Sequence, residues 1–190
     1  MDYSTLAFIA IPIAILYFWY VSIISKRNKA KEALSGIDVQ LKKRSNLIPN
    51  VLKIASKFLG HERSLLNEIT ELRTGSDKDY DQGDTESVRQ HLAAAEQLTG
   101  KMGQLMIAVE DYPDLKSDQT MIQAMQTYNE VEAQIAAARR FYNSAVTSLN
   151  SSVQIFPGNL IAGIAGVSEM PFYEAEEASK AQVDADNYLK

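Results

Sequence analysis

Four charged residues interrupt otherwise apolar helical patterns, and they are the side chains best placed to do chemistry. Arg44 and Glu62 fall in one apolar line, and Glu132 and Arg139 fall in another. Such positions face the interior of a helical bundle, where an unpaired charge is rarely tolerated. The charges could pair across the core, or their long side chains could reach the bundle edge. Glu62 and Glu132 could also act as general acid and base, provided that both line an accessible pocket.

Two further groups of residues resemble metal sites in composition but not in spacing. Alternating aspartates at 77–81 suggest a calcium loop, yet Gln82 stands where such a loop needs glycine. His61 and Glu62 begin like a zinc-protease motif, but no second histidine follows at the required position. With two histidines and no cysteine, a structural zinc site is disfavoured. We therefore expect no metal, no cofactor and no catalytic residues, and predict that the protein is not an enzyme.

The composition is that of a globular helical protein. Of the 190 residues, 46% are apolar and 23% are charged, which argues against global disorder. Only five prolines and nine glycines punctuate the chain, and this scarcity favours long helices. The net charge of −5 gives no reason to expect a nucleic-acid partner.

The apolar segment 6–24 predicts a membrane anchor. Its 19 residues carry no formal charge, and at about 1.5 Å per residue such a helix matches the hydrocarbon thickness of a bilayer. A cleaved signal peptide fits poorly, because no basic residue precedes the segment and no small-residue cleavage site follows it. The anchor residues are expected to be Leu6, Ile9, Ile13, Leu16, Trp19, Tyr20 and Ile24.

Basic residues flank the anchor on its C-terminal side only. They are Lys26, Arg27, Lys29 and Lys31. The positive-inside rule therefore predicts an N-terminus outside the cell and a C-terminal domain in the cytoplasm. The same cations are expected to contact the bilayer at its anionic headgroups.

The remainder of the chain predicts an all-α fold, an antiparallel four-helix bundle with long helices preceded by the one transmembrane helix. A helix is expected over 29–72, kinked or interrupted by Pro49 near Asn46. The other expected elements are an exposed loop at 74–84 and helices at 85–110, 117–155 and 160–167. The apolar pattern resumes at Leu34, so the membrane helix could run almost directly into the first bundle helix.

These elements divide the chain into four parts. They are a short extracytoplasmic N-terminus, the transmembrane helix, the helical bundle and an acidic C-terminal tail, at residues 1–5, 6–24, 25–170 and 171–190.

Several stretches of the chain resemble the LemA family. They are GIDVQLKKRSNLIPNV at 36–51, His61-Glu62, YPDLK at 112–116, EAQIAAAR at 132–139, FYN at 141–143, Asn150, Phe156-Pro157, Phe172 and Glu174. Together they cover most of the chain. Two positions depart from the family pattern, since Leu149 stands where tyrosine is usual and Val167 where phenylalanine is usual. Both differences look like packing changes.

The resemblance implies a protein of the bacterial cytoplasmic (inner) membrane with one N-terminal membrane helix and a cytoplasmic four-helix bundle. Members of the family act in magnetosome membrane formation, which suggests a membrane-organising role by analogy. The family pattern includes Arg44, Glu62, Glu132 and Arg139, so the resemblance favours a structural polar network over side chains that reach the edge. It supplies no catalytic mechanism.

Three functions remain open from the sequence. The first is a non-catalytic scaffold or interaction module that self-associates as a homo-oligomer and contacts other membrane proteins. The second is an adaptor or regulator of a membrane protease or envelope-stress system. The third is an enzyme that uses the carboxylates of Glu62 and Glu132.

Overall fold

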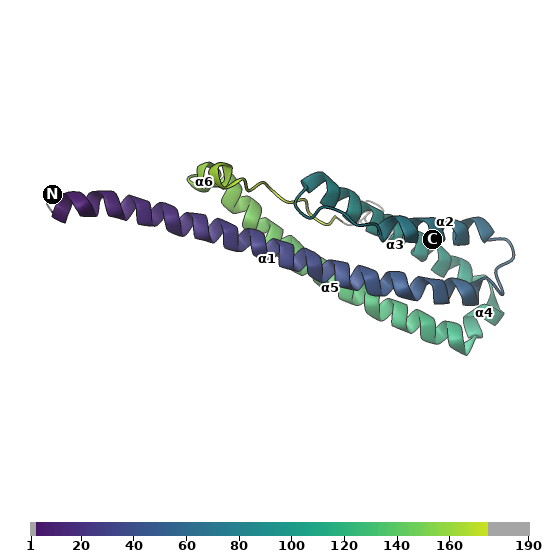
Figure 1. Cartoon of the computed structure of the whole chain (residues 1–190). Coiled ribbons are helices and arrows are strands. Elements are labelled where there is room, and N and C mark those ends of the chain that lie inside the picture. The colour runs from purple at the N-terminus through teal and green to yellow at the C-terminus, as the bar shows by residue number, and fades with distance from the viewer. Residues whose placement is uncertain (1–2, 175–190) are drawn as a thin grey trace, which may run out of the picture.

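The computed structural model describes the backbone of residues 3–174 and the side chains from Ala10 onward. This part of the chain is helical apart from the links between helices and the segment 166–174 (Figure 1). This description leaves out residues 1–2 and 175–190, which belong to the predicted termini. It also leaves out the side chains of the predicted anchor residues Leu6 and Ile9. The helices are α1 (Tyr3–Ala55), α2 (Arg63–Ser76), α3 (Thr85–Glu110), α4 (Pro113–Ser117), α5 (Gln119–Gln154) and α6 (Gly158–Ala165). The prediction of an all-α fold with one long apolar N-terminal helix is confirmed.

The long helices α1 and α5 form an antiparallel pair that runs the length of the bundle (Figure 1). The hairpin of α2 and α3 lies along the end of this pair where α1 finishes, which we call the distal end. At the opposite, proximal end, α5 leads into α6, and α6 packs beside α1. The N-terminal part of α1 projects beyond α6 as a single helix, so the predicted membrane segment and the first bundle helix are continuous.

Local sequence signals explain where α3 and α5 begin and end. The carboxylate of Asp84 accepts a hydrogen bond from the Ser87 amide at 2.9 Å, which caps α3. Asp118 caps α5 in the same way, at 2.9 Å from the Met121 amide. Tyr112 and Pro113 separate these helices, as expected, although the short helix α4 in this link was not predicted.

The expected interruption at Pro49 is wrong, because α1 continues through this residue to Ala55. A proline at position 49 leaves the carbonyl of Ser45 without its usual intrahelical donor. The Nε of Arg73 on α2 donates to that oxygen at 2.9 Å and replaces the missing partner. The helical pattern breaks instead at residues 56–62, between α1 and α2.

Two clusters of buried apolar side chains form the core. The proximal core contains Ile23, Leu34, Ile37, Leu41, Leu92, Ile135, Tyr142, Val146, Leu149, Ile161 and Tyr173, among others. The distal core contains Ile48, Val51, Leu59, Ile69, Leu98, Met102, Leu105, Leu115, Met121 and Tyr128, among others. Arg44 and Ser45 are buried between Leu41 and Ile48, so a polar layer separates the two cores along α1.

Candidate functional site

The projecting part of α1 is the first candidate functional surface. Within the described residues, α1 is the one helix long and apolar enough to cross a membrane. Its apolar side chains are exposed there, with Phe18 at 70%. The predicted anchor residues Ile13, Leu16 and Tyr20 are exposed as well. Exposed apolar side chains on an unpartnered helix are stable in lipid and unfavourable in water.

The end of the predicted anchor is shared with the bundle. Trp19 and Ile24 are partly buried against the proximal core, and Ile23 is fully buried. The ammonium group of Lys26, in the basic flank, donates a hydrogen bond to the Ser152 hydroxyl on α5. Arg27 and Lys31 are partly buried and Lys29 is exposed. The basic flank therefore lies where the projecting helix enters the bundle.

Arg44 occupies the polar layer at the centre of the bundle and is only 1% exposed. Its guanidinium group donates to the Thr99 hydroxyl, to the Ala95 carbonyl at 2.9 Å and to a Glu132 carboxylate oxygen at 3.3 Å. The pair with Glu132 joins α1 to α5, and the other two contacts join α1 to α3. Because a buried guanidinium needs such partners, Arg44 holds these three helices in register.

The other two predicted network residues, Arg139 and Glu62, contact partners other than those of Arg44. Arg139 approaches Glu96 on α3 at 3.8 Å, and its guanidinium carbon lies 5.6 Å from the centre of the Tyr173 ring. Glu62 lies in the link between α1 and α2, where its two carboxylate oxygens each accept from the Tyr112 hydroxyl at 2.9 Å. The structure therefore places Glu62 and Glu132 on different partners in different parts of the bundle.

A second polar cluster surrounds Asp38 and was not predicted as a unit. The carboxylate of Asp38 accepts from the Tyr80 hydroxyl at 2.9 Å and from the Gln82 amide at 3.0 Å, and lies 3.1 Å from His91 Nε2. The rings of Tyr80 and His91 are stacked with centroids 3.9 Å apart. Burial and the Asp38 charge raise the pKa of Tyr80 well above its usual range. Tyr80 is partly buried in the expected exposed loop, so the cluster ties that loop to α1 and α3.

The start of the same loop is held by Asp77. Its carboxylate accepts from the Ser45 hydroxyl at 2.7 Å and pairs with Lys42 at 3.2 Å. Burial opposes ionisation, but these hydrogen bonds hold the pKa of Asp77 below its usual value. Asp77 therefore acts here as an ion-pair partner of α1.

Two asparagines of α5 bind the extended segment that follows α6. The Asn150 amide donates to the Met170 carbonyl at 2.9 Å, and its oxygen accepts from the Met170 amide at 3.0 Å. Asn143 makes the same two contacts with Tyr173, at 3.0 and 2.9 Å. The spacing of seven residues places both asparagines on one face of α5. That spacing was the available sequence signal, but the partner segment could not be inferred from it.

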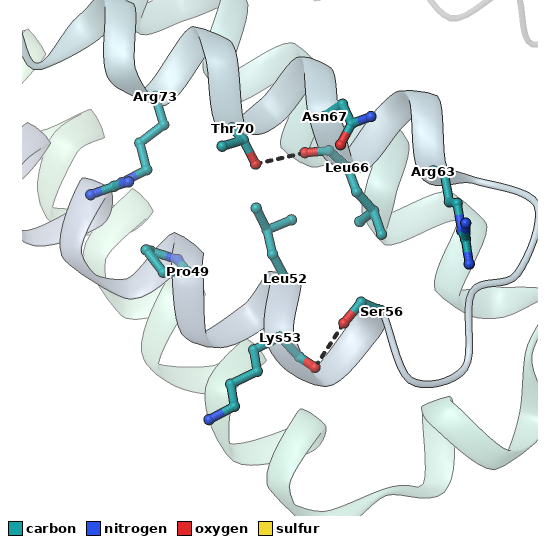
Figure 2. A pocket seen from close by; sticks show the side chains of 9 residues that line it. All are labelled: Pro49, Leu52, Lys53, Ser56, Arg63, Leu66, Asn67, Thr70 and Arg73. Carbon is teal, nitrogen blue, oxygen red and sulfur yellow. Dashed lines mark hydrogen bonds between the residues drawn. The ribbon is translucent and has the colours of Figure 1, made fainter.

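A basic groove lies between the end of α1 and α2 (Figure 2). It has a volume of about 610 Å³ and no carboxylate among its lining residues. Its lining includes the cations Lys53, Arg63 and Arg73, and the apolar residues Pro49, Leu52 and Leu66. Lys53 and Arg63 are exposed, whereas Arg73 reaches toward α1 to bond the Ser45 carbonyl. The sequence did not predict this groove, because its cations come from two helices.

The fold and the projecting apolar helix define a class of all-α proteins whose candidate membrane-spanning helix continues into the bundle. A model of the LemA family matches residues 33–186, and the chain belongs to this family. Protein LemA of Metamycoplasma hominis is 26% identical, over 93% of this chain and 80% of that protein. Magnetosome protein MamQ 2 of Paramagnetospirillum magneticum is 25% identical, over 96% of this chain and 74% of that protein.

Proposed function

We propose that this protein is a non-catalytic scaffold that holds a helical bundle close against the cytoplasmic face of a bacterial inner membrane. The carrying observation is the continuity of α1, which joins an exposed apolar half to a half buried in the bundle core. A continuous helix transmits the position of the anchor to the bundle without a flexible linker. The bundle therefore presents its surfaces at a defined distance from the lipid.

The basic flank supports the cytoplasmic orientation. Lys26, Arg27, Lys29 and Lys31 follow the apolar segment, where the positive-inside rule expects cytoplasmic charge. Relatives named as magnetosome proteins add an analogy to a membrane-organising role.

Self-association of the full chain in the membrane is part of this proposal. Light scattering of the protein in mild detergent, over a range of concentrations, tests it directly. We expect a mass above that of one chain, and a strict monomer at every concentration would contradict the proposal. Orientation is tested with a single cysteine, Ile107→Cys on α3, labelled by an impermeant maleimide. Labelling only after cells are permeabilised is expected.

The basic groove favours a second function, an adaptor that binds an acidic segment of a partner protein. Its cations are complementary to carboxylates, and Leu52 and Leu66 offer apolar contact beside them. The groove lies at the distal end, separated from the anchor by the bundle half of α1, so a soluble segment fits it better than a lipid headgroup.

A photo-crosslinking residue at Asn67, which lines the groove, tests the adaptor function in native membranes. We expect a crosslinked partner that disappears when the charges are reversed by Lys53→Glu with Arg63→Glu. The same crosslinker at Ile107 is the control. Crosslinking at position 67 that survives the charge reversal would argue against recognition through the groove.

A further inference from the structure

The outward face of α6 is apolar, exposed and uncharged. Ile164 is 89% exposed, Leu160 is 61% exposed, and Phe156, just before the helix, is 73% exposed. Leu160 and Ile164 are four residues apart, so they share one face of the helix. The sequence of α6, GNLIAGIA, contains no charged side chain. The opposite face, with Ile161 and Ala162, is buried in the proximal core.

α6 is fixed at the level where the apolar projection of α1 ends. A Cβ atom on Gly158 would lie 3.5 Å from the Trp19 ring and 2.1 Å from the Ser152 carbonyl oxygen, so a side chain cannot fit there. Ile161 and Ala162 join the same core cluster as Ile23. Figure 1 shows α6 beside α1 at the end of its projecting part. α6 therefore stands beside the last turns of the predicted transmembrane segment.

We propose that α6 is a second membrane contact, which lies in the interface of the cytoplasmic leaflet with Leu160 and Ile164 directed into lipid. The inference rests on the proposed membrane anchoring and adds a contact that the anchor alone does not require. An interfacial helix buries its apolar face about 5–10 Å into the headgroup and acyl boundary. With eight residues, α6 is too short to span the bilayer.

Position and charge both favour lipid as the occupant of this face. A helix packed against Trp19 and Ile23 lies at the depth of the anchor's own end, where lipid already surrounds α1. The contact between Lys26 and Ser152 places a cation beside the end of α5 that leads into α6, as expected near anionic headgroups. Two contacts with the bilayer would fix the tilt of the bundle, whereas the anchor alone would act as a pivot.

Because these 190 residues include no cysteine, single-cysteine variants of the chain can test this contact. The variants are Ile164→Cys, Phe18→Cys in the anchor and Ile107→Cys on α3, each exposed and each labelled with an environment-sensitive dye. They are reconstituted into vesicles of phosphatidylcholine and phosphatidylglycerol, with or without nitroxide-labelled lipid. We expect lipid quenching at position 164 to be comparable with that at 18 and several-fold above that at 107.

The quenching results distinguish failure of the α6 contact from failure of the membrane anchor. A dye at position 164 that is quenched by aqueous iodide as strongly as at 107, while the dye at 18 is quenched by lipid, overturns the α6 contact alone. Loss of lipid quenching at 18 overturns the membrane anchor itself. A dye at 164 that is shielded from both quenchers, with shielding lost on dilution of the protein in lipid, would identify a second copy of the chain as the occupant and overturn the proposal.

Discussion

The proximal and distal halves of the bundle bury similar kinds of apolar residue, but different interactions hold their outer segments in place. In the proximal half, polar side chains bind the backbone of the segment after α6, as Asn143 and Asn150 do. In the distal half, apolar side chains from α1, α2, α3, α4 and α5 fill the core. One end finishes in an uncharged apolar helix and the other in a basic groove.

This difference indicates a division of tasks along one rigid helix pair. The proximal half lies beside the predicted anchor, and in the proposed arrangement its helix α6 contacts lipid. Hydrogen bonds from α5 hold the segment after α6 in place. The distal half is far from the anchor and can present charge to soluble partners. Arg44, between the two cores, couples the halves.

The largest expected effect comes from Arg44→Ala, which removes the coupling between the halves. Breaking a buried ion pair typically costs about 3–5 kcal/mol, because the remaining charged and polar groups lose their partner. Here the Glu132 carboxylate would lose its ion-pair partner, whereas the Ala95 carbonyl would keep the hydrogen bond from the Thr99 hydroxyl. Urea unfolding followed by circular dichroism in detergent measures the loss.

The matched control for Arg44→Ala is Arg140→Ala, an exposed arginine of α5. It is expected to change the free energy of unfolding by less than about 0.5 kcal/mol, as surface substitutions usually do. Similar losses for both variants would show that Arg44 has no special role between the cores.

A smaller effect, confined to the proximal half, is expected from Asn150→Ala. The substitution leaves the amide and carbonyl of Met170 without their partners, and each unsatisfied buried group costs about 1–3 kcal/mol. Hydrogen exchange should accelerate at Met170 and in α6 while α2 stays protected. Asn46→Ala, at an exposed position, is the control. Equally fast hydrogen exchange in α2 would show that the two halves of the bundle do not open independently.

In the distal half, the stability that Arg73 contributes is expected to depend on Pro49. Arg73 donates to the Ser45 carbonyl, which the proline leaves without an intrahelical donor. Arg73→Met is expected to cost about 1–2 kcal/mol, since it leaves a buried carbonyl unpaired. In a Pro49→Ala background the cost should fall, because the alanine amide now present at position 49 can supply the intrahelical bond. A double-mutant cycle of unfolding free energies measures this coupling, and additive losses would contradict it.

The smallest effect on stability at neutral pH is expected from the buried tyrosines of the proximal half, which ionise only at high pH. Burial raises the pKa of Tyr173 to about 12, although the positive charges of Arg44 and Arg139 oppose the shift. Burial also raises the pKa of Tyr142 above its usual range. A raised pKa in the folded state gives stability that is complete below the unfolded value of about 10 and is lost as pH rises toward 12.

Tyrosinate absorbance during alkaline titration measures this loss. We expect Tyr173→Phe to remove a late-titrating group and to reduce the alkaline decline in unfolding free energy. An alkaline decline in unfolding free energy that is as steep in Tyr173→Phe as in the unsubstituted protein would contradict this expectation.

Much of the fold followed from local patterns. The helix at 85–110 was predicted with its observed bounds, because a polar, glycine-containing stretch precedes it and Tyr112-Pro113 follows it. The course of α1 through Pro49 was not predicted, because the donor that replaces the proline amide comes from Arg73, on another helix. The cluster around Asp38 was missed for the same reason, since His91 lies 53 positions away in the chain.

The sequence by itself determined the helical class, the long apolar N-terminal helix and the approximate bounds of α3, α5 and α6, since these depend on residue spacing and on neighbours within one turn. Only the tertiary structure decided which polar groups meet. It placed Arg44 against Glu132, stacked Tyr80 on His91, and set α6 beside Trp19. The physical reason is that a buried polar group takes whatever partner the packed helices bring near, and that partner is often remote in sequence.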